Sequence, residues 1–122
     1  MTRKRSKAIF RLEPSPVHGV GVFTHHFILK GTYLPLFAEN DYKFRHTAQT
    51  SYRERKFLER YGIKERKLGY HGSADFNRMS VGWYLNHSKT PNVGHKNFRY
   101  YALRDIHPRE EILIDYATLY TN

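Results

Sequence analysis

The segment Asn86-His87-Ser88-Lys89-Thr90-Pro91-Asn92 is the most informative stretch of this chain. Its five defining residues have the spacing N-H-S-x-x-P-N, a combination that chance rarely produces in a chain of this length. A single histidine is more often a satisfied core residue than a functional one, but five matching positions reverse that preference. The segment is therefore predicted to form part of a binding or catalytic site.

Two further blocks stand upstream and downstream of this segment. Gly19-Val20-Gly21-Val22-Phe23 is a glycine turn that enters a strand, and glycines let a ligand approach the backbone. Alone, G-x-G favours a plain turn, and it does not open a helix as a dinucleotide-binding fold would require. Glu110-Glu111-Ile112-Leu113-Ile114-Asp115-Tyr116 is a short strand followed by a tyrosine. The order of the three blocks is more specific than any one of them.

In this order the three blocks resemble the SET domain, the fold of many protein-lysine methyltransferases, over nearly the whole chain. Residues 27–34 are similar to the family's I-x-K-G-x-x-L pattern, whereas Phe37-Ala38-Glu39 and Arg109 depart from the family's glycine-containing motifs. The resemblance implies several short curved sheets and a C-terminal pseudoknot-like crossing. It also implies S-adenosyl-L-methionine as the cofactor and lysine side chains of protein as the substrate.

The resemblance assigns roles to individual residues. Tyr116 falls on the catalytic tyrosine of the family and is expected to orient the amine. The implied cofactor-binding residues are Gly19, Val20, Gly21, Val22, Tyr84, Asn86, His87, Tyr116 and Tyr120. The candidate walls of the substrate channel are Trp83, Tyr84, Tyr116 and Tyr120. No obvious strong base stands beside Tyr116 in the sequence, so alignment and desolvation of the amine are expected to drive the reaction.

The 122 residues suffice for one domain with a modest core. Many short strand patterns, an aromatic content of 16% and one clear helix predict a mainly β domain with small α insertions. We divide the chain into a basic N-terminal arm, residues 1–7, and a single SET domain, residues 8–122. Within that domain we expect an N-terminal part (8–39), an insert (40–75) and a C-terminal part (76–122).

The clearest single element is a helix over residues 51–61. Ser51 and Glu54 fit a capping box, and Gly62 stands where a helix C-cap belongs. Strands are expected at residues 8–12, 32–37, 98–103 and 112–114, and a short helix over 77–85. Pro35 suggests that the strand over 32–37 lies at the edge of a sheet.

Several classes of protein are excluded or disfavoured by composition. The chain has no cysteine, which excludes disulfides, thiol catalysis and the Cys-bound zinc of some SET relatives. Its eight histidines lack the close spacing of metal ligands, so no metal site is expected. No apolar run has the length of a membrane span, and the basic N-terminus lacks the apolar stretch of a signal peptide. We expect a soluble intracellular protein, in the cytoplasm or, in a eukaryotic host cell, the nucleus.

The net charge of +10 bears on the partners. Such a charge attracts nucleic acid or acidic protein surfaces, although it also serves solubility alone. Because the basic residues gather in the arm and the insert, we expect nucleic acid contact there, and a histone or another nucleic-acid-associated protein as substrate. Only six residues follow Tyr116, so the end of the chain, the insert or a second subunit of a homodimer must roof the lysine channel.

Two alternatives stay open on the sequence. The first is a non-catalytic SET-like module that keeps the fold but binds nucleic acid or a protein partner. The second is a methyltransferase that acts on a group other than lysine, because the motifs define the donor side better than the acceptor side. Affinity for the methyl donor separates the first alternative from an enzyme, and the identity of the methylated residue separates the second.

Overall fold

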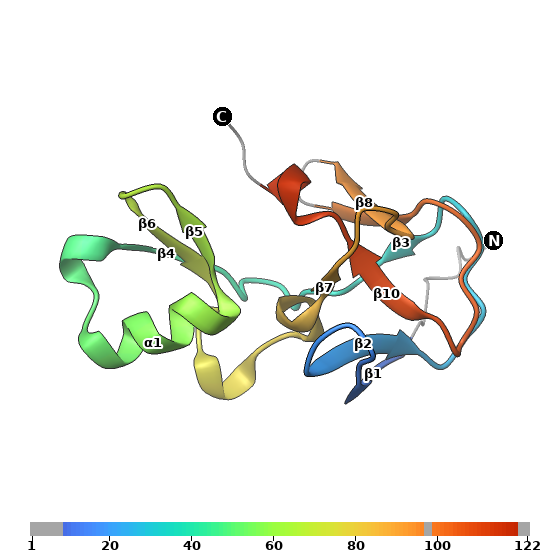
Figure 1. Cartoon of the computed structure of the whole chain (residues 1–122), viewed down its shortest axis with the longest axis horizontal. Helices are drawn as coiled ribbons and strands as arrows, with labels where there is room; N and C mark the ends of the chain where they lie inside the picture. Colours follow the sequence, from blue (N-terminus) through green and yellow to red (C-terminus); the bar gives the residue numbers. More distant parts are fainter. Residues whose placement is uncertain (1–8, 97–98, 120–122) are drawn as a thin grey trace.

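The computed structural model describes residues 9–96 and 99–119 (Figure 1). These residues form ten short strands, one α-helix and four 3-10 turns, which confirms a mainly β domain with small α insertions. The strands make three small sheets. The arm over residues 1–7 and Tyr120 lie outside the described residues. We call residues 9–39 and 76–119 the body and residues 40–75 the insert.

The first sheet of the body joins the two ends of the chain. Its strand order is β1 (Phe10–Pro14), β2 (Val20–Thr24), β10 (Glu111–Ile114) and β7 (Asn86–His87). β10 pairs antiparallel with β2 and parallel with β7. β1 covers Phe10–Pro14 rather than the expected residues 8–12, because the hairpin register pairs Pro14 with Val20, and a proline is tolerated at the end of an edge strand.

The second sheet has the order β3 (Tyr33–Leu34), β9 (Arg99–Ala102) and β8 (Val93–Lys96). The expected strand over 32–37 is reduced to two residues, and it does lie at the edge, next to Pro35. Residues from both sheets and from the segments that connect their strands form one apolar core. It contains Val22, Ile28, Leu34, Leu36, Leu85, Val93, Ala102, Ile106, Ile112 and Ile114.

The insert forms a separate lobe beside the body (Figure 1). Its sheet has the order β4 (Lys43–His46), β6 (Gly69–Gly72) and β5 (Ile63–Glu65), with α1 (Tyr52–Tyr61) between β4 and β5 in the chain. The predicted capping box at Ser51 and Glu54 is present. Gly62 ends the helix in an extended conformation, φ −104°, and a side chain there would lie 2.8 Å from the Leu58 carbonyl oxygen.

Residues 77–85 were expected to form one short helix, which is wrong. The chain instead makes two 3-10 turns, η2 (Phe76–Arg78) and η3 (Val81–Tyr84). The Asp75 carboxylate caps η2 by accepting from the Asn77 N–H at 2.9 Å, and the Gly82 N–H bonds to the Leu36 carbonyl at 2.9 Å. These local and tertiary bonds replace the regular helical ladder. No helix in the described part of the chain is both long and apolar enough to cross a membrane.

Candidate functional site

The side chain of Asn86 holds the glycine bend in place. Its Nδ2 donates to the carbonyl oxygens of His18 at 3.0 Å and Val20 at 2.9 Å, and it lies 2.7 Å from the Glu111 Oε2. The residue is buried, so unsatisfied amide atoms would be costly here. Two segments separated by more than sixty residues are thereby fixed to each other by the Asn86 amide nitrogen.

The two glycines of the bend serve different purposes. Gly19 has φ +48°, a left-handed conformation that favours glycine, and the space around it is open. At Gly21 a side chain would collide with the Glu111 carboxylate. That carboxylate also accepts from the Ser15 hydroxyl at 2.6 Å. The G-x-G pattern therefore combines a turn with a close approach to a buried acid.

The segment over residues 86–92 lies along the C-terminal strand. The Asn92 side chain donates to the Glu111 carbonyl at 2.8 Å and accepts from the Leu113 N–H at 2.8 Å. The Ser88 N–H bonds to the Ile114 carbonyl at 2.9 Å. Together with the parallel pairing of β7 and β10, these bonds hold the crossing of the two segments.

Tyr116 follows β10 directly and reaches back to the segment over residues 85–87. Its hydroxyl donates to the Leu85 carbonyl at 2.5 Å, and its N–H donates to the Nδ1 of His87 at 3.0 Å. The two rings lie with their centroids 5.1 Å apart. Tyr116 is 37% exposed, so its position is fixed while part of its surface stays accessible.

The structure places the imidazole of His87, a weak base, beside Tyr116, where the sequence offers no obvious strong base. Its Nδ1 also lies 3.7 Å from the Asp115 carboxylate. Because Nδ1 accepts the Tyr116 N–H, this arrangement corresponds to the tautomer with its proton on Nε2. The His87 nitrogen nearer to Tyr116 is therefore occupied by the backbone of that tyrosine.

Trp83 and Tyr84 lie on η3, where they contact the insert and the segment of the body that leads into it. The Trp83 indole N–H donates to the Asp41 carboxylate at 3.2 Å, and its ring packs edge-on against Phe37. The ring of Tyr84 lies 5.5 Å from that of Tyr61 on α1. The structure therefore places both aromatic residues between the body and the insert, directly before Leu85.

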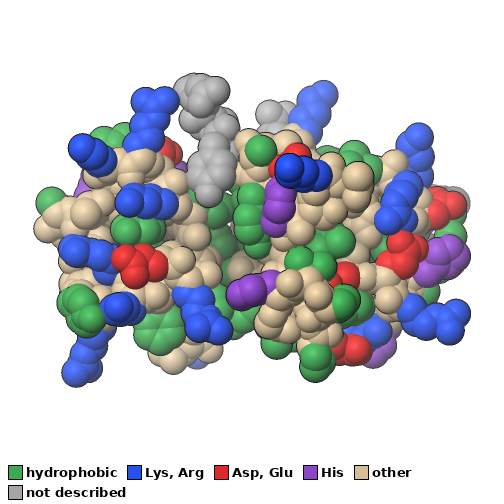
Figure 2. Space-filling view, viewed as in Figure 1, with side chains coloured by type: hydrophobic (Ala, Val, Ile, Leu, Met, Phe, Trp, Pro, Cys, Tyr) green, Lys and Arg blue, Asp and Glu red, His purple; other side chains and the backbone are tan. Residues whose placement is uncertain are grey.

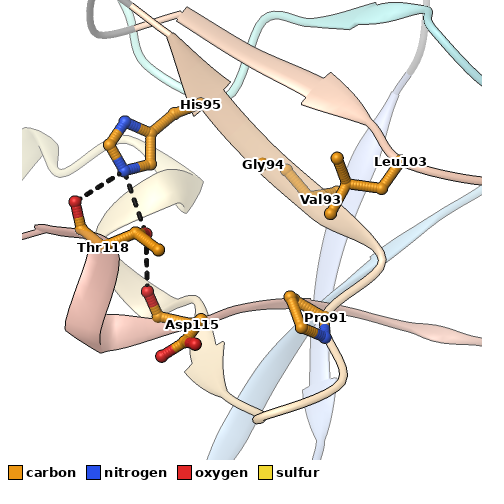
Figure 3. Close-up of a pocket in the computed structure, with 7 residues that line it drawn as sticks. All are labelled: Pro91, Val93, Gly94, His95, Leu103, Asp115 and Thr118. Atoms are coloured by element: carbon orange, nitrogen blue, oxygen red, sulfur yellow. Dashed lines mark hydrogen bonds between the residues drawn. The ribbon is translucent and has the colours of Figure 1, made fainter.

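A pocket of about 330 Å³ borders the segment that carries Tyr116 (Figure 3). Its apolar lining includes Pro91, Val93 and Leu103. Its polar lining consists of His95, Asp115 and Thr118. The His95 Nε2 lies 3.0 Å from both the carbonyl and the hydroxyl oxygen of Thr118, so β8 is tied to the 3-10 turn η4 (Tyr116–Leu119). No group of three or more His, Asp or Glu residues that could hold a metal occurs in the described ranges.

A family model for the SET domain matches residues 19–117 of the sequence. The chain belongs to the SET domain family. No curated protein matches the sequence. The match spans all three blocks, from the glycine bend to the residue after Tyr116.

Solved structures show the same fold. A candidate histone methyltransferase of Plasmodium falciparum is 20% identical, with a TM-score of 0.57, over 88% of this chain and 91% of that one. KRYPTONITE, solved with DNA, an H3 peptide and SAH, is 19% identical with a TM-score of 0.61; 93% of this chain matches 24% of that one. The methyltransferase domain of human PR domain-containing protein 2 is 22% identical with a TM-score of 0.55, over 85% and 74% of the two chains.

Three residues with central positions in this SET domain were not among the catalytic, cofactor-binding or channel residues expected from the sequence. Glu111 bonds to Asn86 and Ser15, Leu85 supplies the carbonyl that receives the Tyr116 hydroxyl, and Asp41 accepts from four donors at the start of the insert. An acid within an apolar strand was a signal for Glu111. The sequence carries no signal for Leu85, because its contribution is a backbone atom.

Proposed function

We propose that this SET domain transfers a methyl group from S-adenosyl-L-methionine to lysine side chains of protein. The observation that supports this proposal most strongly is that three segments far apart in the sequence converge in space. Asn86 binds the glycine bend, and the hydroxyl of Tyr116 binds the carbonyl of the residue before Asn86. In this proposal, the segments that the resemblance assigns to donor and acceptor meet at one place.

On the donor side, the backbone of the site fits a ligand better than the Asn86 side chain does. The Asn86 side chain is buried and its Nδ2 is bonded within the protein, whereas Gly19 is exposed with open space around it and the His87 side chain is 40% exposed. We propose that the bend over residues 19–22 and the backbone of residues 86–87 hold the donor. When bound, S-adenosyl-L-methionine supplies an electrophilic methyl group on a positively charged sulfur.

On the acceptor side, Tyr116 would orient the amine. A lysine amine with an ordinary pKa costs roughly 4.6 kcal/mol to deprotonate at pH 7. Aromatic and apolar surroundings disfavour its charged form. A phenol can donate one hydrogen bond and accept another, and we propose that the Tyr116 hydroxyl, which donates a hydrogen bond to the Leu85 carbonyl, accepts one from the amine N–H. We propose that Trp83 and Tyr84 contribute to the channel wall, and that Tyr120 does so from outside the described residues.

The substrate is proposed to be a histone or another nucleic-acid-associated protein inside a cell. The net charge of +10 supports this, because it favours substrates held near a polyanion. KRYPTONITE, which shares the fold, was solved with both DNA and an H3 peptide. A second subunit as part of the channel roof stays a prediction.

Two measurements on the full chain and its Tyr116→Phe variant test the function. Isothermal titration with S-adenosyl-L-methionine measures donor binding, and mass spectrometry of proteins incubated with donor and enzyme measures turnover and identifies the methylated residue. We expect Tyr116→Phe to lower turnover at least about 100-fold while donor affinity changes less than about threefold, because the phenol acts on the amine. Equal loss of both would remove the proposed role of Tyr116.

Tyr33→Phe provides a matched control. Tyr33 is 42% exposed on β3, and its ring packs on Tyr101 in the second sheet. This variant is expected to keep wild-type turnover. A wild-type chain without donor affinity would support the non-catalytic module, and methylation at another residue type would overturn the lysine assignment.

A further inference from the structure

The sheet of the insert has two chemically different faces. Arg45 pairs with Tyr70 across the sheet and contacts α1, since its Nε lies 3.4 Å from the Glu54 carboxylate. A side chain at Gly72 would lie 2.9 Å from Leu58 of the same helix. Helix α1 therefore covers this face. The residues that alternate with Arg45 point to the opposite face.

The opposite face is occupied by aromatic rings. Phe44 pairs with His71 across the sheet, and their ring centroids lie 4.8 Å apart. The ring of His46 lies 4.9 Å from Phe44, and the ring of Tyr42 stacks on His71 at 5.7 Å and 26°. Tyr42 is 54% exposed and His46 is exposed, so ring surface is available to a ligand. We call these four residues the aromatic face.

Hydrogen bonds hold the central ring of this face. The Tyr42 hydroxyl lies 2.5 Å from the Nδ1 of His71, and the His71 Nε2 lies 2.6 Å from the Glu65 carboxylate. Burial and the Glu65 charge raise the pKa of Tyr42, so its phenol stays neutral. Rings that are already ordered lose little entropy when a flat ligand stacks on them. The rings of the aromatic face are therefore preorganised for stacking with a planar ligand.

Two exposed cations, Arg66 and Lys67, lie at one end of the aromatic face, in the turn between β5 and β6. Lys43 and Lys64 are also exposed on the two edge strands, but their register with Arg45 and Tyr70 directs them to the α1 side of the sheet. The insert has nine Lys and Arg residues against five Asp and Glu residues, a net charge of +4. Figure 2 shows Lys and Arg side chains spread over the visible face of this lobe. The one acid on the aromatic face, Glu65, is paired with His71.

We propose that the aromatic face binds single-stranded nucleic acid, with bases stacked on the rings and phosphates near Arg66 and Lys67. Stacking rings beside a positive surface are the shared chemistry of proteins that bind single strands. A duplex keeps its base faces buried in its own stack, and an acidic peptide offers charge without planar bases. This inference goes beyond the proposed methyl transfer and stands without it.

Fluorescence anisotropy of the full chain with a labelled oligothymidine of about 12 nucleotides tests the proposal. Tyr42→Leu and His46→Leu are each expected to weaken binding about tenfold, because each removes one stacking surface while keeping apolar volume. The pair Arg66→Asn and Lys67→Gln is expected to lower the slope of log affinity against log salt by about 1.4. The matched control is Tyr52→Leu, since Tyr52 is 71% exposed on α1, away from the aromatic face; its affinity should change less than twofold.

Competition with other polyanions distinguishes base stacking from simple charge attraction as the source of affinity. A duplex of the same sequence and a polyglutamate peptide are expected to displace the labelled strand much less effectively than unlabelled oligothymidine. Equal displacement by either competitor, or unchanged affinity of Tyr42→Leu, would overturn the proposal and leave a purely electrostatic surface.

Photo-crosslinking of the wild-type chain gives a readout that does not depend on the folding of any variant. With a bromouracil-substituted single strand, crosslinked peptides are expected within residues 42–46 and 69–72. Crosslinks confined to α1 would place the nucleic acid on the wrong face of the insert and would overturn the assignment.

Discussion

The body and the insert are stabilised by different kinds of buried side chain. The body has a continuous core of ten apolar residues drawn from two sheets and the segments that connect their strands. In the insert, Leu58 and Tyr70 are the buried apolar residues, and they share the interior with Asp41, Arg45, Thr50 and Ser73. Apolar burial scales with area and tolerates small shifts, whereas buried polar groups depend on individual hydrogen bonds. The insert should therefore open locally under conditions that leave the body folded.

The largest effect is expected from Ile112→Ala in the body. Ile112 is fully buried in β10, opposite Val22 of β2. The substitution should lower the free energy of unfolding by about 4 kcal/mol, because it removes apolar contacts and leaves a cavity. Urea unfolding followed by circular dichroism measures the change. Leu29→Ala is the control, since Leu29 is 62% exposed; a similar loss for both variants would contradict the assignment of the core.

The next effect is expected from Asn92→Leu, which tests a buried amide that ties the crossing to the backbone of β10. The change removes two hydrogen bonds and leaves the Glu111 carbonyl and the Leu113 N–H without a partner. We expect a loss of about 3 kcal/mol, independent of pH, because no ionisable side chain is involved. A loss below about 1 kcal/mol by urea unfolding at pH 5 and pH 7 would show that water replaces these bonds.

Asp41→Asn tests the polar anchor of the insert. Burial by itself raises the pKa of Asp41, but hydrogen bonds donated by Ser73, Ser80 and Ala74 outweigh it and lower the pKa below the ordinary value. The folded pKa is therefore depressed. The anchor contributes fully above the unfolded pKa of about 3.9 and is lost as pH falls through the folded pKa.

The variant is expected to destabilise the insert by about 2 kcal/mol, because an amide group brings N–H donors where donors already converge. Trp83 is the single tryptophan and donates to this carboxylate, so its fluorescence reports the anchor directly. On acidification, the wild type should change its Trp83 emission before circular dichroism reports unfolding of the body, and the variant should already show the changed emission at pH 7. Simultaneous loss of both signals in the wild type would mean that insert and body unfold as one unit.

A feature of this protein could be predicted from the sequence when it depends on residues close together in the chain or on a specific order of motifs. The capping box at Ser51 and Glu54 was predictable because it depends on residues three positions apart. The three blocks identified the body because their order is specific. The strand expected over 32–37 shrank to Tyr33–Leu34, since strand length depends on a partner strand that lies far away in sequence. The partners of Asp41 and the carbonyl of Leu85 could not be predicted, because neither tertiary hydrogen bonds nor backbone positions leave a pattern in residue types.

The smallest effect is expected from Ser51→Ala at the start of α1. The Ser51 hydroxyl accepts from the Glu54 N–H at 3.2 Å, and the Glu54 side chain accepts from the Ser51 N–H at 3.3 Å. Losing this cap should cost about 1 kcal/mol, and the loss should be confined to the insert. Hydrogen exchange should therefore speed up about fivefold for amides of α1 while amides of β2 and β10 keep their rates. Faster exchange in β10 as well would show that the helix supports the body, and the separation between the two regions would then be wrong.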